Sequence, residues 1–87
     1  MTHTPHKILL HPFVTEKTMN HMELENKLEF LVRRGTTKPQ IKLAFEQLYE
    51  VKVVKVNTMM CADGKHAIIK LKEGYSAEDI GMRIGVF

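Results

Sequence analysis

The chain has 87 residues, enough for one small domain with a single core. Its hydrophobic fraction of 44% and charged fraction of 26% are typical of a globular protein, and no apolar run approaches the about 18 residues of a membrane-spanning helix. The single cysteine excludes an intrachain disulfide framework, and the first residues lack the apolar core of a secretory signal, so we expect a cytoplasmic protein without membrane insertion.

The net charge of +3 is unevenly distributed along the chain. Residues 27–72 hold ten Lys/Arg and four Asp/Glu, whereas residues 73–87 hold one Arg and three acids. A basic middle region favours a surface that faces a polyanion. The alternative is that these cations belong to an ordinary solvated surface without a specific partner.

The N-terminal region predicts a loose start, a short strand and a helix. Residues 1–7 are polar and expected to be flexible, with a single domain over residues 8–87. KILL at residues 7–10 predicts an edge strand that Pro12 limits. Thr15 is a candidate helix N-cap, and Glu16 then lies in the first turn, where a negative charge suits the helix dipole. Met19 and Met22 should face inward.

The next two elements form a predicted strand–helix pair. Residues 27–33 alternate apolar and polar side chains, with Leu28, Phe30 and Val32 on one face, as in a half-buried strand. The run TTKP at 36–39 supplies a hydroxyl cap and an early proline for a helix. The apolar stripe of this helix has the i, i+3, i+4, i+7 spacing: Ile41, Ala44, Phe45 and Leu48.

Residues 51–72 predict a hairpin. In the first strand, 51–60, Val54, Val56, Thr58 and Met60 share the phase that we assign to the core. Val51 and Val53 have the other phase, so we expect a bulge or a loop join near Lys52 and Val53. The sequence ADGK at 62–65 supplies the turn. The second strand, 66–72, should place its alternate apolar residues inward: Ala67, Ile69 and Leu71.

A last helix follows a Glu-Gly break. Ser76 is its predicted cap, with Asp79 as the partner in a capping-box variant, and Gly85 is the predicted stop. The apolar stripe of this helix contains Ala77, Ile80 and Ile84. The element order predicts an α+β fold in which a four-stranded, mainly antiparallel sheet with a split βαβ (ferredoxin-like) arrangement carries three helices.

Catalytic and metal motifs are not recognisable in this sequence. Glu16 and Lys17 are adjacent, so on a helix they project about 100° apart, and no oriented nucleophile or second carboxylate accompanies them. Cys61 and His66 flank the predicted hairpin turn, His3, His6 and His11 crowd the N-terminus, and His21 stands apart from both groups. One cysteine and dispersed imidazoles lack the paired spacing of structural zinc sites, so we expect no metal and no cofactor.

Nucleic-acid binding is the remaining hypothesis from the residues. Arg33, Arg34, Thr37 and Lys38 gather at a helix N-terminus, which already favours phosphate, and Lys42 lies one turn further along. Lys55, Asn57 and Met59 should alternate on the strand face opposite the core. The two hairpin strands carry further cations: Lys52 on the first, and Lys65, His66, Lys70 and Lys72 on the second. The predicted hairpin strands carry no aromatic residue, which excludes RNA recognition by base stacking.

Three stretches in order, PFVTEKTM, TKPQIKLAFEQLYEVKVVKVNTMM and AIIKLKEG, resemble the universal large-subunit ribosomal protein L23 family, and the tail YSAEDIGMRIGVF resembles its archaeal branch. The resemblance spans residues 8–87. It implies a non-enzymatic protein that binds large-subunit ribosomal RNA near the polypeptide exit tunnel. It also implies contact with the neighbouring ribosomal protein twenty-nine and a role in docking signal recognition particle or other nascent-chain factors.

The resemblance carries roles to individual positions. It implies RNA contacts at Thr37, Lys38, Lys42, Lys52, Asn57, Thr58, Lys65 and Lys70. Glu16, with Lys17, implies a partner-docking turn, because bacterial members use the corresponding acid for the chaperone trigger factor; archaea are expected to lack this chaperone, so another factor is implied.

Two departures from the family pattern qualify the resemblance. The hairpin turn is short, whereas bacterial members extend a basic loop into the tunnel, so we expect no contact inside the tunnel. His66 stands at a position that the family fills with a basic residue, and its RNA contact would weaken on deprotonation. The alternative function is a ferredoxin-like small-molecule or regulatory binding module without specific RNA affinity.

Overall fold

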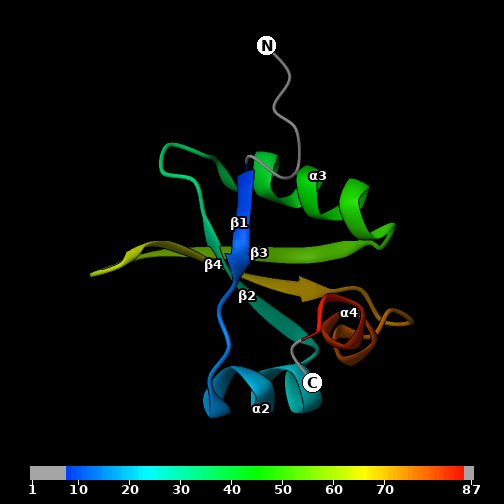
Figure 1. Ribbon diagram of the computed structural model, residues 1–87. Coiled ribbons are helices and arrows are strands. Elements are labelled where there is room, and N and C mark those ends of the chain that lie inside the picture. The colour runs from blue at the N-terminus through cyan, green and yellow to red at the C-terminus, as the bar shows by residue number, and fades with distance from the viewer. Residues whose placement is uncertain (1–7, 86–87) are drawn as a thin grey trace.

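The computed structural model describes residues 8–85, so the predicted flexible segment 1–7 lies outside the described residues. The helices and strands follow in the order β1 (Leu9–Pro12), α2 (Glu16–Glu25), β2 (Lys27–Val32), α3 (Lys38–Tyr49), β3 (Val53–Cys61), β4 (Gly64–Leu71) and α4 (Ala77–Ile84). The four strands form one antiparallel sheet in the order β1-β2-β4-β3. β4 therefore lies between β2 and β3, which run parallel to each other and are joined by α3, so the predicted split βαβ arrangement is confirmed (Figure 1).

The core lies between the sheet and helices α3 and α4. Leu28, Phe30 and Val32 are each exposed by 3% or less, which confirms the alternation predicted for β2. Phe30 packs edge to face against Phe45 of α3, with ring centroids 5.6 Å apart. Ala77 and Ile80 bring α4 into the same core cluster. Both helices thus cover one face of the sheet.

Three side-chain caps define the helix starts. Thr15 and Thr37 each accept a hydrogen bond from the backbone N–H three residues on, and each forms a reciprocal capping box. Ser76 accepts from the backbone N–H of Asp79, but the described residues of α4 show no reciprocal bond, so the predicted capping-box variant is wrong in that half. Asp79 instead places its charge in the first helical turn.

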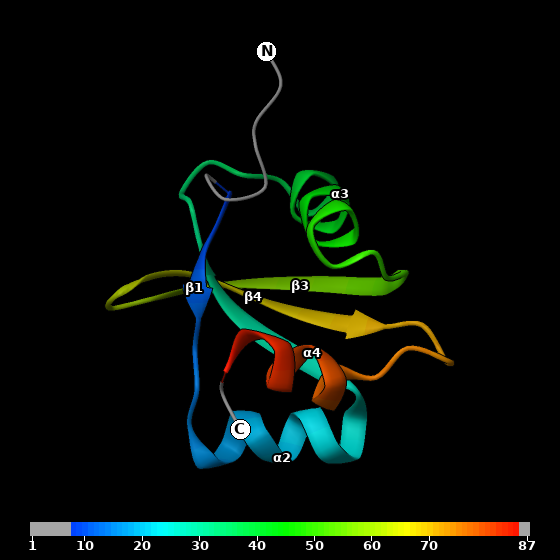
Figure 2. The same ribbon diagram turned by 45° about the vertical axis from the view of Figure 1, so that its right-hand side comes forward.

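Asn26 links the C-terminal end of α2 to the segment that leads into α4. It ends α2 with a left-handed backbone, at φ 57°. Its side-chain amide donates to the carbonyl oxygen of Tyr75 and its side-chain oxygen accepts from the N–H of Ala77, both at 2.7 Å. α2 is thereby fixed beside α4, whereas α3 lies at the opposite end of the molecule in both views (Figures 1 and 2).

The predicted phase of β3 is wrong at two positions. Val54 and Met60 are 57% and 60% exposed, whereas Val53 and Val56 are buried. The register slips between Val53 and Lys55, so the irregularity predicted near Lys52 and Val53 is a bulge at Val54. The extra residue lets Val53 and Val56 share the core face although they are three positions apart.

The first strand is displaced by two residues from its prediction. It runs from Leu9 to Pro12 instead of 7–10, and pairs only with β2. Proline is accepted at its end because an edge strand has one unpaired side. Met22 is buried and Met19 partly buried against the core, as predicted.

Candidate nucleic-acid interface

The start of α3 positions two of the predicted RNA-binding lysines. The Thr37 hydroxyl accepts from the N–H of Gln40 at 3.3 Å, and the side-chain oxygen of Gln40 accepts from the N–H of Thr37 at 2.9 Å. This capping box fixes the first turn, so Lys38 and Lys42 lie about one turn apart on the exposed surface. The Thr37 hydroxyl keeps its own proton available for donation to a ligand oxygen.

A groove runs between α3 and the outer strand β3. Lys38, Pro39, Lys42, Val54, Lys55 and Val56 line this α3–β3 groove. Three of these six residues are lysines, none is acidic, and the bulge at Val54 forms part of the wall. The α3–β3 groove therefore combines an apolar floor with cations from two separate elements.

A row of three lysines continues from the groove across the other face of the sheet. Lys55 lies directly opposite Lys70 on β4, and Lys70 lies opposite Lys27 on β2. Directly paired residues project to the same face, so Lys27, Lys70 and Lys55 form a lysine row over three adjacent strands. Like charges in this arrangement destabilise a sheet, and a bound polyanion would offset that cost.

Lys27 is the residue that sequence reasoning missed. The sequence of β2 shows only that Lys27 points away from the face that carries buried Leu28. Glu25 partly neutralises its charge, because Glu25 Oε1 lies 3.6 Å from Lys27 Nζ. The pairing of β2 with β4 brings Lys27 to Lys70. Only a prediction of the register between β2 and β4 could have identified Lys27 as part of this surface.

The remaining predicted RNA-binding residues lie around this surface but not all within it. Arg33 and Arg34 are exposed in the loop between β2 and α3, and Lys52 is exposed before β3. Asn57 is exposed two residues beyond Lys55 on the same face. Thr58 is half-buried on the core face of β3.

Lys65 has an internal partner. Its Nζ donates to the carbonyl oxygen of Thr36 at 2.5 Å, and the side chain is partly buried. Thr36 itself is buried and donates its hydroxyl proton to the carbonyl oxygen of Arg33 at 2.7 Å. Lys65 therefore ties β4 to the loop that carries Arg33 and Arg34.

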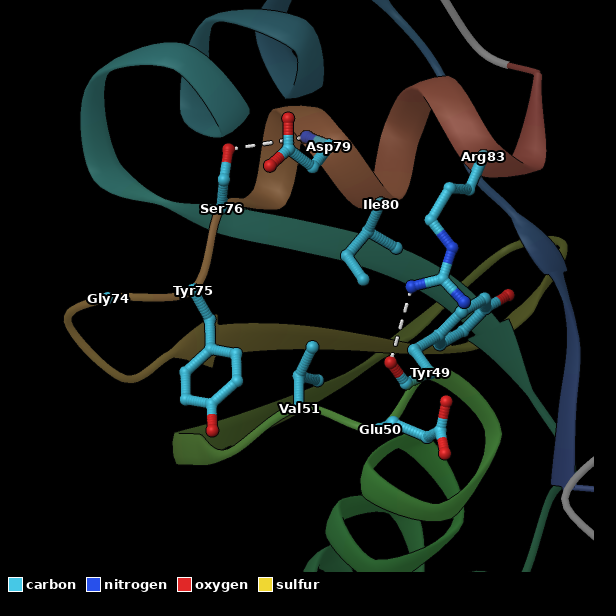
Figure 3. A pocket seen from close by; sticks show the side chains of 9 residues that line it. All are labelled: Tyr49, Glu50, Val51, Gly74, Tyr75, Ser76, Asp79, Ile80 and Arg83. Carbon is cyan, nitrogen blue, oxygen red and sulfur yellow. Dashed lines mark hydrogen bonds between the residues drawn. The ribbon is translucent and has the colours of Figure 1, made fainter.

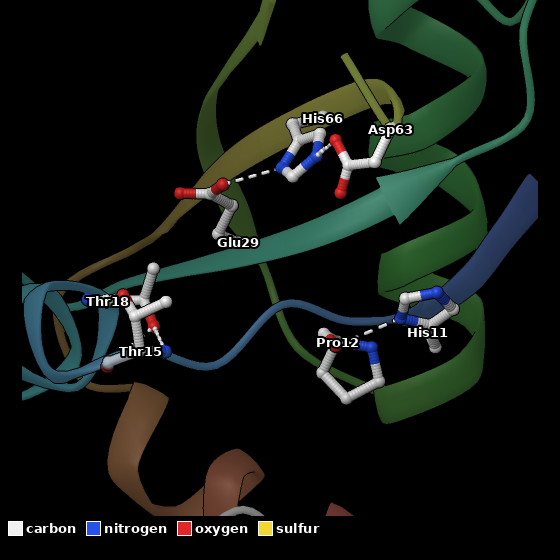
Figure 4. A network of polar contacts seen from close by, with 7 residues as sticks. All are labelled: His11, Pro12, Thr15, Thr18, Glu29, Asp63 and His66. Atoms are coloured by element: carbon white, nitrogen blue, oxygen red, sulfur yellow. Dashed lines mark hydrogen bonds and ion pairs between the residues drawn. The ribbon is translucent and has the colours of Figure 1, made fainter. Parts of the chain in front are cut away.

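His66 corrects one sequence-based expectation. Its side chain is 2% exposed, so it is not presented to RNA as the family position suggested. Its Nδ1 lies 2.7 Å from Glu29 Oε2 and its Nε2 lies 2.7 Å from Asp63 Oδ1 (Figure 4). The Phe13 ring closes the site edge to face, with ring centroids 4.6 Å apart. The sheet face opposite α3 is thus partly covered by the segment before α2.

The two carboxylates determine the charge of His66. Burial disfavours the imidazolium, but hydrogen bonding to Glu29 and then to Asp63 outweighs burial and raises the pKa of His66 above its ordinary value. The same contact lowers the pKa of Asp63 below its ordinary value. A doubly protonated ring can donate from both nitrogens, which matches the two short contacts.

Glu16 and Lys17 belong to α2, far from the predicted RNA-binding lysines of α3 (Figure 2). Both are exposed in the first turn of α2, at the end of the molecule opposite α3 (Figure 2). The Thr15 cap fixes this turn: its hydroxyl accepts from the N–H of Thr18 at 3.2 Å, and the Thr18 hydroxyl accepts from the N–H of Thr15 at 2.7 Å. The predicted docking residues and the predicted RNA-binding residues therefore belong to separate surfaces.

A second pocket lies between the C-terminal end of α3 and α4 (Figure 3). Arg83 donates to the carbonyl oxygen of Tyr49 at 3.3 Å and lies over the Tyr49 ring. The Ser76 hydroxyl already accepts a hydrogen bond from the N–H of Asp79 as the N-cap of α4. Glu50 and Asp79 add negative charge to the pocket. Burial raises the pKa of the Tyr49 phenol, partly opposed by Arg83, so the phenol stays neutral. Its mixed charge makes this pocket a poor counterpart for a polyanion, and its Arg83 and Ser76 groups already have internal partners.

No helix among residues 8–85 has the length and apolar character needed to cross a membrane.

Comparison with known proteins gives a consistent family. The family model described as Ribosomal protein L23 matches residues 7–65. A large ribosomal subunit protein uL23 of Picrophilus torridus is 49% identical over 79 residues, covering 91% of this chain and 96% of that protein. Proteins of the same name from Methanothermobacter thermautotrophicus and Methanosphaera stadtmanae are 46% and 49% identical over 84 residues, covering 95% of this chain and 98% of each relative. The chain therefore belongs to the ribosomal protein L23 family, a family of structural ribosomal components and not of enzymes.

Proposed function

We propose that this protein is a structural constituent of the large ribosomal subunit in the cytoplasm and binds large-subunit ribosomal RNA through the α3–β3 groove and the lysine row. One observation carries the RNA-binding part of the proposal. Lys38 and Lys42 from α3 and Lys55 from β3 surround a single groove without an acidic residue. Within the described residues none of these three lysines forms an ion pair, so their charges are available to phosphate.

Recognition would depend on backbone shape and charge. Cations held on two rigid elements match phosphates at fixed spacing, while Thr37 and Asn57 supply hydrogen bonds to phosphate or 2′-hydroxyl groups. The aromatic side chains Phe30, Phe45 and Tyr49 pack against one another in or beside the core. They are not arranged on the exposed sheet face as a stacking platform.

Salt dependence tests the RNA contact. We expect the affinity of the protein for large-subunit ribosomal RNA to fall steeply with salt, because each neutralised phosphate releases counterions. Lys38→Ala should weaken binding and reduce the slope of log affinity against log salt by about 0.7–0.9. Lys17→Ala removes the same charge from α2 and is the matched control, which should keep the wild-type slope. Equal slopes for Lys38→Ala and wild type would remove Lys38 from the contact.

We propose a second surface at the start of α2, which receives exit-site factors such as signal recognition particle. The protein would then lie beside the polypeptide exit tunnel, next to ribosomal protein twenty-nine. Support comes from the exposure of Glu16 and Lys17 in the first turn of α2 and from the position of α2 at the opposite end of the molecule from α3 (Figure 1). Residues Cys61 to Gly64 close the β3–β4 hairpin tightly, so no long loop extends from it.

Glu16→Gln tests this second surface. The change keeps side-chain size and removes one exposed charge, so RNA binding should be unchanged while ribosomes carrying the variant bind signal recognition particle more weakly. Glu23→Gln, on an exposed position of the same helix, is the matched control. Identical factor affinities for Glu16→Gln and Glu23→Gln ribosomes would contradict the docking role.

A further inference from the structure

Three potential metal ligands meet at the tip of the β3–β4 hairpin. Cys61 ends β3, Asp63 lies in the turn and His66 belongs to β4. One ligand atom from each residue lies within 4.8 Å of the others. Thiolate, carboxylate and imidazole are the three ligand types that proteins use for zinc.

We propose that Cys61, Asp63 and His66 bind a Zn²⁺ ion at the hairpin tip, with the fourth coordination position open to water. Three protein ligands with one open position form a recognised zinc arrangement. The site differs from the sequence-based expectation because it uses a single cysteine, without the paired spacing of structural zinc motifs. It is also separate from the α3–β3 groove and does not depend on RNA binding.

His66 is already oriented for this role. Glu29 contacts its Nδ1 at 2.7 Å, which directs Nε2 toward Asp63 (Figure 4). Phe13 packs against the ring and limits its movement. Metal-binding histidines almost always pair their other ring nitrogen with a carboxylate, carbonyl or water, and Glu29 would be that partner.

The required rearrangement is small. Tetrahedral zinc with bonds of about 2.0–2.3 Å places neighbouring ligand atoms about 3.3–3.8 Å apart. Nε2 and Asp63 Oδ1, now 2.7 Å apart, would separate slightly, and the Cys61 thiol would approach. Cys61 and Asp63 are exposed at the end of the hairpin, so side-chain rotation can supply both movements while His66 stays fixed.

Ligand chemistry selects the metal. The soft thiolate and the imidazole favour zinc over Mg²⁺ or Ca²⁺, which prefer all-oxygen sites. On binding, the Cys61 thiol and the Nε2–H of His66 each release a proton to solvent, and the metal takes both positions. Asp63 binds as the carboxylate.

Cobalt titration of the reduced 87-residue chain tests the site. Because Cys61 is the only cysteine, a near-ultraviolet thiolate-to-Co²⁺ charge-transfer band can arise only from this residue. We expect saturation at one equivalent, visible bands of tetrahedral Co²⁺, and displacement by Zn²⁺. Cys61→Ser should abolish the charge-transfer band, Asp63→Asn should lower affinity about tenfold or more, and Glu29→Gln should lower it about 10–100-fold.

Controls separate this site from other imidazoles and from the RNA surface. A variant with His3, His6 and His11 changed to Gln should keep the band and the affinity. Cys61→Ser should keep the wild-type salt slope for RNA. Absence of the band at one equivalent of Co²⁺, or an unchanged titration in either Asp63→Asn or a folded His66→Gln, would overturn the proposal. Asp63→Asn alters an exposed side chain and still decides the question if His66→Gln fails to fold.

Discussion

His66 illustrates how one buried residue depends on groups distant in the sequence. Glu29 reaches it from β2, Asp63 from the turn, and Phe13 from the segment before α2. A buried charge is tolerated only when paired, and here two carboxylates provide the pairing. His66 therefore joins the hairpin to β2 and to the segment that leads into α2.

This pairing predicts a pH-dependent stability. The pKa of His66 is raised in the folded protein, so the stabilisation is fully present below the unfolded pKa of about 6.5 and is lost as pH rises through the folded pKa. In chelator-containing buffer, the free energy of unfolding should fall above pH 6.5 by at most about 1.4 kcal/mol per pH unit. Denaturant titrations across this range measure the fall.

Two variants sharpen this measurement. His66→Gln should remove the decrease that wild type shows above pH 6.5, whereas His21→Gln, on α2, should retain it. Glu29→Gln removes the larger favourable contact and so lowers the folded pKa of His66; the decrease should therefore end at a lower pH and be smaller in total than in wild type. A wild-type slope in both His66→Gln and Glu29→Gln would contradict the assigned ionisation.

Local chemistry explains which single-residue features the sequence could predict. Thr15, Thr37 and Ser76 were predicted as caps because a cap depends on residues within one turn. The burial of His66 could not be predicted, because it depends on the register that places Glu29 and the hairpin turn on either side of the ring. A helix cap bonds to a residue three positions away, whereas His66 and Glu29 are 37 residues apart in the sequence.

At the scale of elements, strand pairing creates the features that matter most for function. The bulge at Val54 rotates Lys55 to the face that also carries Lys70, and β4 places Lys70 beside Lys27. Alternation alone predicted the core face of β2 correctly but assigned Val54 to the core of β3, where it is exposed. A bulge changes the phase of a strand without any turn residue to mark its position.

The lysine row predicts a conflict between stability and binding. Lys70 lies between Lys55 and Lys27, so Lys70→Gln should relieve repulsion and raise the free energy of unfolding by about 0.2–1 kcal/mol, more at low salt. The same change should weaken RNA binding. Lys72→Gln, just beyond the strand, is the control for removal of a charge outside the row.

Urea unfolding and RNA titration measure the two effects on the same samples. A Lys70→Gln variant that is less stable than Lys72→Gln would contradict the repulsion, and undiminished RNA affinity would exclude Lys70 from the interface.

At the scale of the whole molecule, the fold separates two surfaces. The Asn26 hydrogen bonds fix α2 beside α4, whereas α3 lies at the other end of the molecule, with β3 between α3 and α2 (Figures 1 and 2). The architecture was predictable because β2, α3, β4 and α4 have clear apolar periods and the connections are short. The convergence of Lys38, Lys42 and Lys55 on one groove required the packing of α3 on β3.

The most direct test of the account is lysine modification of the protein free and bound to large-subunit ribosomal RNA, read by mass spectrometry. Lys38, Lys42 and Lys55 should react in the free protein and become protected in the complex. Lys70 should show the same protection. Lys17, exposed at the far end of the molecule, should react equally in both states. Protection of Lys17 with continued reactivity of Lys38, Lys42 and Lys55 would contradict the proposed RNA-binding surface.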